Sequence, residues 1–300
     1  MEDMVRKILN SRRFHHYIRD PSAVAGSLIF IVMLFGAIFT PLIAPQDPYD
    51  MRTLSLKDSL KPPIWMKGGE APFLLGTDDQ GRDILSATLY GCRTSFIVGF
   101  STIAIASAIG VIIGLLSGFY GGILDAVTMR LADMLFSFST TLVAMLLLGI
   151  FGGGGIHLII IAIIITDWVR YARTMRGSVL GVKEEDYVSA AKASGAGDLR
   201  IILGHILPNA VPPILVVAAV DFGAVVMLEA TLSFLGVGVP INKPSLGMMI
   251  SLGRNYIYAG KWWLIIFPGG ALVAIVLGVN LLADWLREEI NPKFQKGKVV

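Results

Sequence analysis

Residues 94–119 read TSFIVGFSTIAIASAIGVIIGLLSGF and contain no charged side chain. A helix that crosses the hydrocarbon core of a bilayer needs about 20 mostly apolar residues, with a practical range of about 17–25. This stretch reaches that length and is longer than an apolar run in the core of a soluble domain. It therefore predicts a membrane-spanning helix and an integral membrane protein.

Further segments share this length and apolar character. They are 24–43, 131–150, 155–171, 213–235 and 264–283. The segment 155–171 is the weakest, because Asp167 and Arg170 interrupt its end. The segment 264–283 has tryptophans at both ends, as the aromatic belts of a membrane interface prefer. Together the segments predict an all-α integral membrane fold with six transmembrane helices.

The composition of the whole chain agrees with this class. Hydrophobic residues make up 54% and charged residues 16%, whereas a soluble domain carries about a quarter charged. The net charge of +3 comes without a block of basic residues, which argues against nucleic acid as a partner. The single Cys92 excludes an intrachain disulfide.

The distribution of basic residues orients the predicted helices. With the N-terminal tail inside, the inner segments hold sixteen Lys and Arg and the outer segments hold nine. The positive-inside rule then places both termini in the cytoplasm. The predicted organisation is a cytoplasmic N-tail at 1–23, a first transmembrane helix at 24–44, an extracytoplasmic lobe at 45–93, a five-helix core at 94–286 with a cytoplasmic loop at 172–208, and a cytoplasmic C-tail at 287–300.

The cytoplasmic loop carries its own helical pattern. Acidic residues at 184–186 favour a helix start through the macrodipole, and the Ala-rich stretch 187–193 propagates the helix. The Gly-Ala-Gly sequence at 195–197 breaks it, Asp198 is placed to cap a second helix, and Pro208 is expected to end that helix. We therefore predict two short helices joined by a glycine elbow.

This loop resembles a known family. The EAA motif of bacterial ABC importer permeases runs Glu-Ala-Ala, three residues, Gly, nine residues, Ile, one residue, Leu-Pro. The chain matches the spacing with Ser189-Ala190-Ala191, Gly195 and His205-Ile206-Leu207-Pro208. Ser189 stands where the motif has Glu and His205 where it has Ile. The resemblance implies a docking site for an ATPase, formed by Tyr187, Ser189, Ala190, Ala191, Gly195, Ile206, Leu207 and Pro208.

Two further strings are similar to the dipeptide/oligopeptide/nickel branch of these permeases. Residues 75–83 read LGTDDQGRD and resemble the LGTDxxGRD signature of its C-type subunit, and residues 232–238 resemble the end of its penultimate helix. The extracytoplasmic signature residues are Gly76, Thr77, Asp78, Gly81, Arg82 and Asp83.

The resemblance implies a type I ABC importer permease fold in a bacterial inner or archaeal plasma membrane. It implies a homologous second permease, two cytoplasmic ATPases, an extracytoplasmic binding protein and surrounding lipid as partners. ATP and Mg would be bound by the ATPases, so no cofactor and no catalytic residue is expected in this chain. Peptides are the expected cargo.

Carboxylates inside the fifth predicted helix are the candidate pathway residues. A charge at that depth costs several kcal/mol unless it is paired or faces water. Asp221 and Glu229 lie eight positions apart, about 80° around the helix, and Ser233 follows. They are expected to line a polar translocation path or gate, or else to pair with an Arg or backbone donor of a neighbouring helix. An ion-coupled carrier or channel that uses Asp221 and Glu229 without ATP stays as the alternative function.

Two other patterns leave alternatives open. Small residues recur every four positions at 106, 110, 114 and 118, which is typical of a close helix packing seam, either with the partner permease or within the chain. The charged residues Asp125, Arg130, Asp133, Asp167 and Arg170 are expected to form ion pairs between helix ends. Alternatively, Arg170, Arg173 and Arg176 contact anionic lipid or the ATPase.

No metal site is expected. His157 and His205 are isolated, and residues 77–83 lack the full calcium-loop pattern and its terminal Glu. A membrane-embedded enzyme has no support either, because no nucleophile–base pair or ligand set is apparent.

Overall fold

The computed structural model describes residues 17–48, 50, 52, 54–151, 155–240 and 243–290. Within this part the regular structure is helical, with one isolated bridge between Thr77 and Asp83. The predicted tails are described only at 17–23 and 287–290. The longer helices are α3 (Pro21–Ile38), α5 (Ile84–Tyr120), α6 (Gly122–Phe136), α7 (Thr140–Ile150), α8 (Ile156–Lys183), α12 (Pro212–Phe234) and α14 (Trp263–Ile290).

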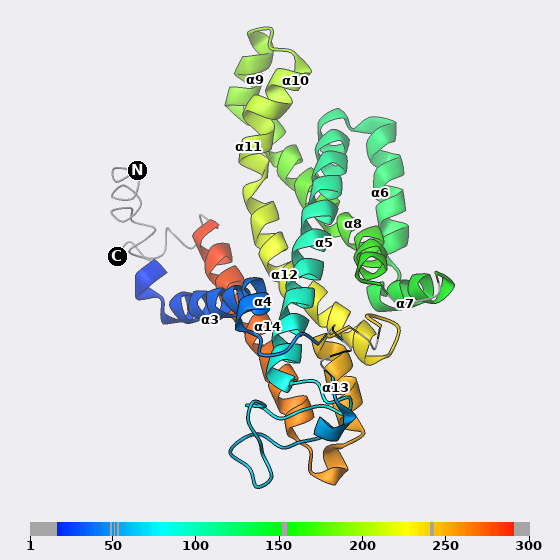
Figure 1. Ribbon diagram of the computed structural model, residues 1–300. Helices are drawn as coiled ribbons and strands as arrows, with labels where there is room; N and C mark the ends of the chain where they lie inside the picture. Colours follow the sequence, from blue (N-terminus) through cyan, green and yellow to red (C-terminus); the bar gives the residue numbers. More distant parts are fainter. Residues whose placement is uncertain are drawn as a thin grey trace.

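Shorter elements connect them. These are α4 (Thr40–Ile43), η1 (Leu56–Asp58), α9 (Asp186–Ala193), α10 (Asp198–Ile201), η2 (Ile202–Ile206), α11 (Leu207–Ala210), α13 (Leu246–Arg254) and η3 (Ile257–Ala259). Figure 1 shows α9 and α10 at one end of the molecule, and α13 with the loop before α5 at the other end. The predicted cytoplasmic loop and the predicted outer lobe therefore lie at opposite ends of the bundle.

Four helices of the described part are long and apolar enough to cross a membrane: α3, α5, α12 and α14. They contain the predicted segments 24–43 (with α4), 94–119, 213–235 and 264–283, so these four predictions are confirmed as helices. The paired helices α6 and α7 add a fifth crossing if they count as one span. The all-α membrane class is therefore correct, and six crossings stay a prediction.

The predicted span 131–150 is wrong as a single helix. It begins earlier, at Gly122, and breaks between α6 and α7, which are bent by 85°. The Ser137 hydroxyl donates to the Met134 carbonyl at 2.6 Å, a back-bond that competes with the helical ladder and bends helices. Ser139 then adopts an extended conformation before α7 starts. The Ser137 hydroxyl thus lies at the interruption of a segment whose only charged residue is Asp133.

The predicted segment 155–171 lies within α8. This helix is longer than predicted and extends to Lys183. Besides Asp167 and Arg170, it carries Arg173 within its first eighteen residues, so its charge distinguishes it from the four apolar helices.

Helices α5 and α8 pack directly against each other along the small residues of α5. A Cβ atom added to Gly114 would lie 2.3 Å from the Ala172 carbonyl oxygen, and one added to Gly110 would lie 2.6 Å from that of Trp168. Such backbone approach is possible only without a side chain. The seam is therefore formed within the chain, the second of the two alternatives raised by the sequence.

Asp125 and Asp133 form ion pairs between α6 and α8, as predicted, but their partners are Arg176 and Arg173, for which the sequence had also allowed contact with lipid or the ATPase. Arg170 pairs with Asp221 of α12, and the ion pairs expected for Arg130 and Asp167 are not found among the described residues. Arg176 donates to both carboxylate oxygens of Asp125, at 2.5 and 2.6 Å. Arg173 donates to Asp133 at 2.5 Å and stacks over the Phe136 ring at 4.4 Å from its centroid. The bidentate geometry at Asp125 makes this the stronger of the two pairs.

Candidate functional site

The element between α8 and α12 begins with the predicted helix and elbow. Helix α9 starts after Glu185, and Gly195 follows its end with a φ of +78°. A left-handed conformation of this kind favours glycine. The prediction of two short helices joined by a glycine elbow is confirmed. Asp198 is the first residue of α10 and not its cap, since Gly197 holds the capping position.

The expectation that Pro208 ends the second helix is wrong. Residues 202–206 form a π turn, in which the Leu207 N–H donates to the Ile202 carbonyl, and α11 continues through Pro208. Proline has no N–H for the preceding turn, and its ring collides with the carbonyl four residues earlier. A π turn inserts one extra residue and removes that conflict. The chain therefore continues helically through α11 to Ala210, and only Val211 separates α11 from α12.

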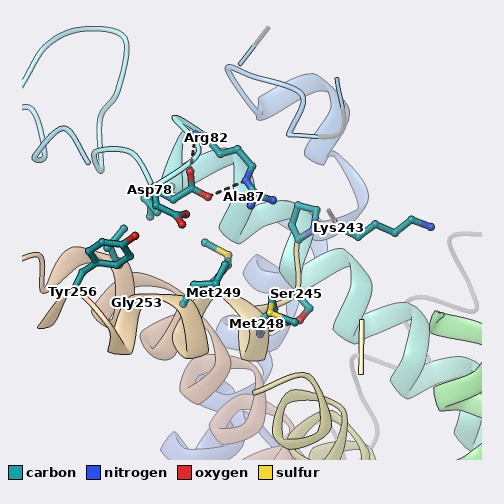
Figure 2. A pocket seen from close by; sticks show the side chains of 14 residues that line it. Asp78, Arg82, Ala87, Lys243, Ser245, Met248, Met249, Gly253 and Tyr256 are labelled. Atoms are coloured by element: carbon teal, nitrogen blue, oxygen red, sulfur yellow. Dashed lines mark hydrogen bonds and ion pairs between the residues drawn. The ribbon is translucent and has the colours of Figure 1, made fainter. Parts of the chain in front are cut away.

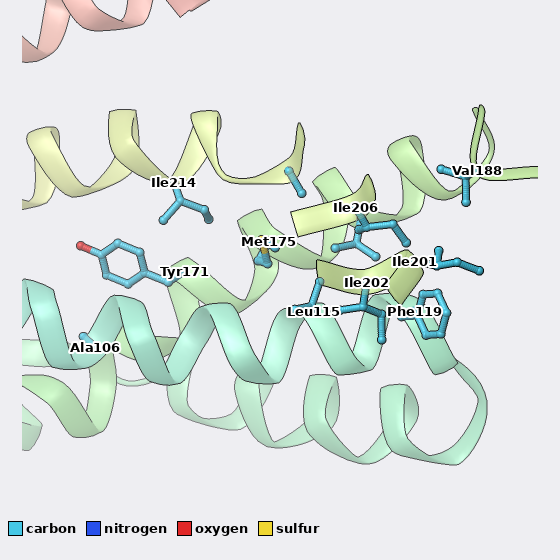
Figure 3. Packing of buried hydrophobic residues seen from close by; sticks show 12 residues of the cluster. Ala106, Leu115, Phe119, Tyr171, Met175, Val188, Ile201, Ile202, Ile206 and Ile214 are labelled. Carbon is cyan, nitrogen blue, oxygen red and sulfur yellow. The ribbon is translucent and has the colours of Figure 1, made fainter. Parts of the chain in front are cut away.

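An apolar cluster anchors this element to the transmembrane helices (Figure 3). Val188, Ile201 and Ile206 are buried, and they pack with residues of α5 and α8 that include Phe119 and Met175. Lys183 also donates to the Phe119 carbonyl at 2.5 Å, which satisfies an orphan acceptor at the end of α5. The element is therefore fixed to α5 and α8 and has little freedom to move alone.

The predicted coupling residues divide between its two faces. Tyr187, Ser189, Ala190, Gly195 and Pro208 are exposed, whereas Ala191 and Leu207 are half-buried and Ile206 is buried.

Two exposed leucines complete the outer face. Leu199 and Leu203 are 70% and 53% exposed, four positions apart in the turn that carries Ile201 and Ile206 on its inner side. The sequence reading missed both. Their signal was the run of apolar residues at 199, 201–203 and 206–207, more than one buried face requires.

The 75–83 string forms an ordered turn at the opposite end. Asp78 Oδ1 accepts the backbone N–H groups of Gln80 and Arg82 at 2.8 Å each, and its Oδ2 lies 2.9 Å from Arg82 Nε. Gly81 has a φ of +76° and lies against the Ser55 carbonyl. Burial raises the pKa of Asp78, and the Arg82 guanidinium partly offsets that rise. The signature residues thus build the turn itself.

This turn also fixes the starts of two long helices. Asp83 caps α5 by accepting the Ser86 N–H at 2.8 Å and the Ser86 hydroxyl at 2.6 Å, while burial raises the pKa of Asp83. The Thr77 carbonyl accepts the indole N–H of Trp263, the first residue of α14, at 3.3 Å. Figure 2 shows Asp78 and Arg82 opposite Met249 and Tyr256, across a small cavity.

We expect Asp78→Ala to loosen this turn. The change removes two backbone acceptor bonds and the pair with Arg82, at a cost of about 1–3 kcal/mol to the local structure. Limited proteolysis of the purified protein should cut the 54–83 region several-fold faster. Asp79→Ala is the matched control, because Asp79 Oδ1 has no hydrogen-bond partner among the described residues. Equal cleavage rates in the two variants would contradict this role of Asp78.

The carboxylates of α12 lie in two different environments. Asp221 is 1% exposed and pairs with Arg170 of α8. Glu229 is fully buried and accepts hydrogen bonds from the Ser95 and Ser233 hydroxyls at 3.0 and 2.9 Å. The structure therefore brings Glu229 and Ser233 together and places Asp221 elsewhere. Ser95, on α5, was missed because it is 134 residues from Glu229.

A polar cavity of about 280 Å³ lies at the break between α6 and α7. One side is formed by Thr166, Asp167 and Arg170 of α8. The other side is formed at the break by Leu135, Phe136, Phe138, Ser139 and Thr140. Because the Arg170 guanidinium also pairs with Asp221, the cavity is linked electrostatically to α12.

Long apolar helices, a helical element fixed at one end and an ordered lobe at the other define a multi-pass membrane protein with the organisation of a transporter permease. Comparison with known proteins makes this specific. Residues 110–296 match the model of the family described as "Binding-protein-dependent transport system inner membrane component". Residues 11–63 match "N-terminal TM domain of oligopeptide transport permease C". The chain belongs to the family of binding-protein-dependent inner membrane components, and it is a permease subunit of an ABC transporter, not its ATPase.

Relatives match over nearly the whole chain. A di/tripeptide transport system permease protein of Pseudomonas aeruginosa is 37% identical over 93% of this chain and 90% of the relative. A dipeptide transport system permease protein of Haemophilus influenzae is 35% identical over 94% of both chains. The oligopeptide transport system permease protein of Bacillus subtilis is 37% identical over 91% of this chain and 86% of its own length. The resemblance stated from the sequence is confirmed.

Solved structures share the fold at lower identity. An inward-facing MetNI methionine ABC transporter chain has a TM-score of 0.51 at 20% identity, and covers 68% of this chain and 93% of that chain. An amino acid ABC transporter chain, crystallised with histidines, has a TM-score of 0.50 at 16% identity, over 70% and 94% of the two chains. Membership of the family implies an ATPase and a binding protein as partners.

Proposed function

We propose that this chain forms one half of the translocation pathway of an ATP-driven importer of di- or oligopeptides. Its partners in this proposal are a homologous second permease, two cytoplasmic ATPases that bind ATP and Mg, and an extracytoplasmic binding protein. Peptide cargo is supported by the relatives, which are named as di/tripeptide, dipeptide and oligopeptide permeases.

In the proposed topology α8 and the bent pair α6–α7 each cross the membrane, which gives six crossings. Helix α8 has 28 residues, about 42 Å at 1.5 Å per residue, and thus exceeds the roughly 30 Å hydrocarbon core. Both termini, the C-terminal turns of α8 and the loop 184–208 that follows it are then cytoplasmic, and the lobe between α4 and α5 is extracytoplasmic.

The observation that carries the proposal is the outer face of the α9–α10 element. Its exposed residues are small at Ser189, Ala190 and Gly195 and apolar at Leu199 and Leu203. Exposed apolar residues of this kind mark a surface that a protein partner covers, and small ones let that partner approach closely. A movement of an ATPase subunit docked here would displace α9 and α10 together, because both are packed on α5 and α8.

The inner face of the same element gives that movement a path. Its buried residues pack on α5 and α8, and π turn η2 and α11 join it directly to α12. We infer that ATP binding closes the two ATPases and moves the loop 183–208. The attached helices then rotate as packed bodies to open an outward cavity, and hydrolysis resets the gate.

The alternative of an ion-coupled carrier receives less support. Such a carrier needs Asp221 or Glu229 to be available to an ion. Instead, Asp221 is paired with Arg170, and the Glu229 carboxylate accepts two hydroxyl donors.

Reconstitution tests the proposed function. The chain would be purified with its second permease and ATPases, placed in proteoliposomes with the binding protein, and assayed for uptake of radiolabelled dialanine. We expect uptake into the vesicles only when ATP is inside them, on the side of the ATPases, and only when the binding protein is outside. Uptake by this chain alone, without ATPases, would overturn the proposal.

A further inference from the structure

The cavity at the break between α6 and α7 contains an unused buried charge. Asp167 is 7% exposed and lines the cavity. Its carboxylate forms no hydrogen bond and no ion pair with any residue in the ranges that the structure describes. A carboxylate buried to this degree costs several kcal/mol unless a cation or donors compensate it. The cavity is therefore a place where a cation or hydrogen-bond donors could compensate the Asp167 carboxylate.

The surrounding charges select a cation. Arg170, three positions further along α8, forms its ion pair with Asp221 and also attracts Asp167 electrostatically, so two carboxylates share one guanidinium. Arg173, the next cation on α8, is paired with Asp133 and stacked on Phe136. The groups around the cavity thus carry one net negative charge, and Asp167 is the carboxylate that forms no ion pair among the described residues.

The depth of the cavity fits a transported molecule. Asp167 lies eleven residues beyond the start of α8 at Ile156, about 17 Å along the helix axis. In the proposed topology α8 starts near the outer interface, so Asp167 lies close to the middle of a hydrocarbon core about 30 Å thick. Ionisable groups at that depth mark substrate or ion paths.

The size and walls of the cavity suggest a small organic cation. Its volume of about 280 Å³ holds about nine water molecules at roughly 30 Å³ each, near the lower limit of ligand pockets. Phe136 and Phe138 provide apolar wall, and Ser139 and Thr140 provide hydroxyls at the start of α7. A bare metal ion needs neither this space nor these aromatic rings.

We propose that this cavity holds the amino-terminal ammonium group of a peptide during its passage, with the Asp167 carboxylate as its counter-ion. The inference rests on the peptide cargo of the proposed function and names the site in this chain that recognises it. The ammonium donates charge-assisted hydrogen bonds to Asp167 at about 2.7–2.9 Å. The side chain of the first residue lies against Phe136 and Phe138.

Binding to the purified permease–ATPase complex, without the binding protein, tests the site directly. Dialanine and N-acetyl-dialanine would be titrated against the wild-type complex, and the thermal midpoint would be followed. We expect dialanine to raise the midpoint and N-acetyl-dialanine, which lacks the ammonium, to do so only at more than tenfold higher concentration. Equal midpoints with the two peptides would overturn the proposal without any variant.

Variants then assign the effect to Asp167. Asp167→Asn should raise the half-saturating concentration of dialanine at least tenfold and remove the discrimination between the two peptides, whereas Asp167→Glu should retain part of it. Asp133→Asn is the matched control, because Asp133 is a neighbouring acid outside the cavity, paired with Arg173. Discrimination that survives in Asp167→Asn would contradict the assignment. Stabilisation by sodium chloride in place of dialanine would identify an inorganic cation site and also overturn it.

Transport by the complete system separates this inference from the proposed function. If the wild-type importer takes up dialanine with ATP and Asp167→Asn does so at the same rate and half-saturation, only the cavity assignment fails. If the wild-type importer takes up no peptide, the proposed function fails. The expected result is wild-type uptake, with at least tenfold weaker half-saturation in Asp167→Asn.

Discussion

Uptake of peptide should fall more than about 100-fold when Ala190 is replaced by glutamate or by arginine. Ala190 is exposed on α9, next to the half-buried Ala191 and away from the apolar cluster beneath the element. A charge placed there would be buried without a partner when the ATPase docks, which costs about 3–5 kcal/mol. Each 1.4 kcal/mol corresponds to a factor of ten in binding. The stimulation of ATP hydrolysis by peptide-loaded binding protein should fall in parallel.

Testing both signs covers an ATPase surface of either charge. The matched control is Gly181→Glu, near the C-terminal end of α8, where an added Cβ meets nothing within 4 Å. We expect its uptake to stay within about twofold of wild type. Ala190 is preferred to Ala191, because substitution of Ala191 would also disturb packing against the cluster. Wild-type uptake by both Ala190 variants would rule out docking on this face.

The second large effect is on folding. Gly114→Val should separate α5 from α8, because its Cβ would lie 2.3 Å from the Ala172 carbonyl oxygen and 2.8 Å from the Met175 Cβ. Carbon atoms need about 3.5–4.0 Å, so the helices must move apart by more than about 1 Å. The closest atom is backbone and no rotamer change relieves the clash. Overpacking costs about 3 kcal/mol or more at such a site.

The measurement is the thermal midpoint of the detergent-purified protein, with monodisperse yield as a second readout. We expect Gly114→Val to lower the midpoint by about 5–10 °C or to give no monodisperse protein. Gly177→Ala is the control on the facing helix, because its Cβ meets nothing within 4 Å. Alanine should raise helix stability there by about 0.5–1 kcal/mol. A Gly114→Val midpoint equal to that of Gly177→Ala would disprove the close seam.

Features set by local composition were predictable from the sequence. The apolar lengths of segments 24–43, 94–119, 213–235 and 264–283 required helices, because only helices satisfy the backbone in hydrocarbon. The glycine elbow at Gly195 was predictable for the same local reason, since φ is positive there and glycine accepts it at no steric cost. The spacing of the loop motif, together with the strings at 75–83 and 232–238, indicated the family.

Features set by distant partners were not predictable. At the break at 137–139 the Ser137 hydroxyl donates to the Met134 carbonyl of its own helix. The same sequence is compatible with a straight helix, so the break could not be predicted from it. The pair between Arg170 and Asp221 joins residues 51 positions apart, so the sequence left Asp221 open between a pathway and a structural role. The sequence placed Asp167 in an ion pair between helix ends. The packed helices show instead that Arg170, the nearest cation along α8, forms its ion pair with Asp221 of α12.

The π turn at 202–206 sets the direction in which α9 faces relative to α11 and α12. Each residue of a helix rotates the chain by about 100° and advances it by about 1.5 Å, and this turn holds one residue more than an α turn. Removing that residue would rotate α9 about the axis of α10 and α11, so that Ala190 and Leu199 would face in a different direction. The number of residues between Gly195 and Pro208 therefore sets the orientation of α9. An insertion or deletion there would leave α9 and α10 folded but turn their outer face away from the ATPase of the proposed function.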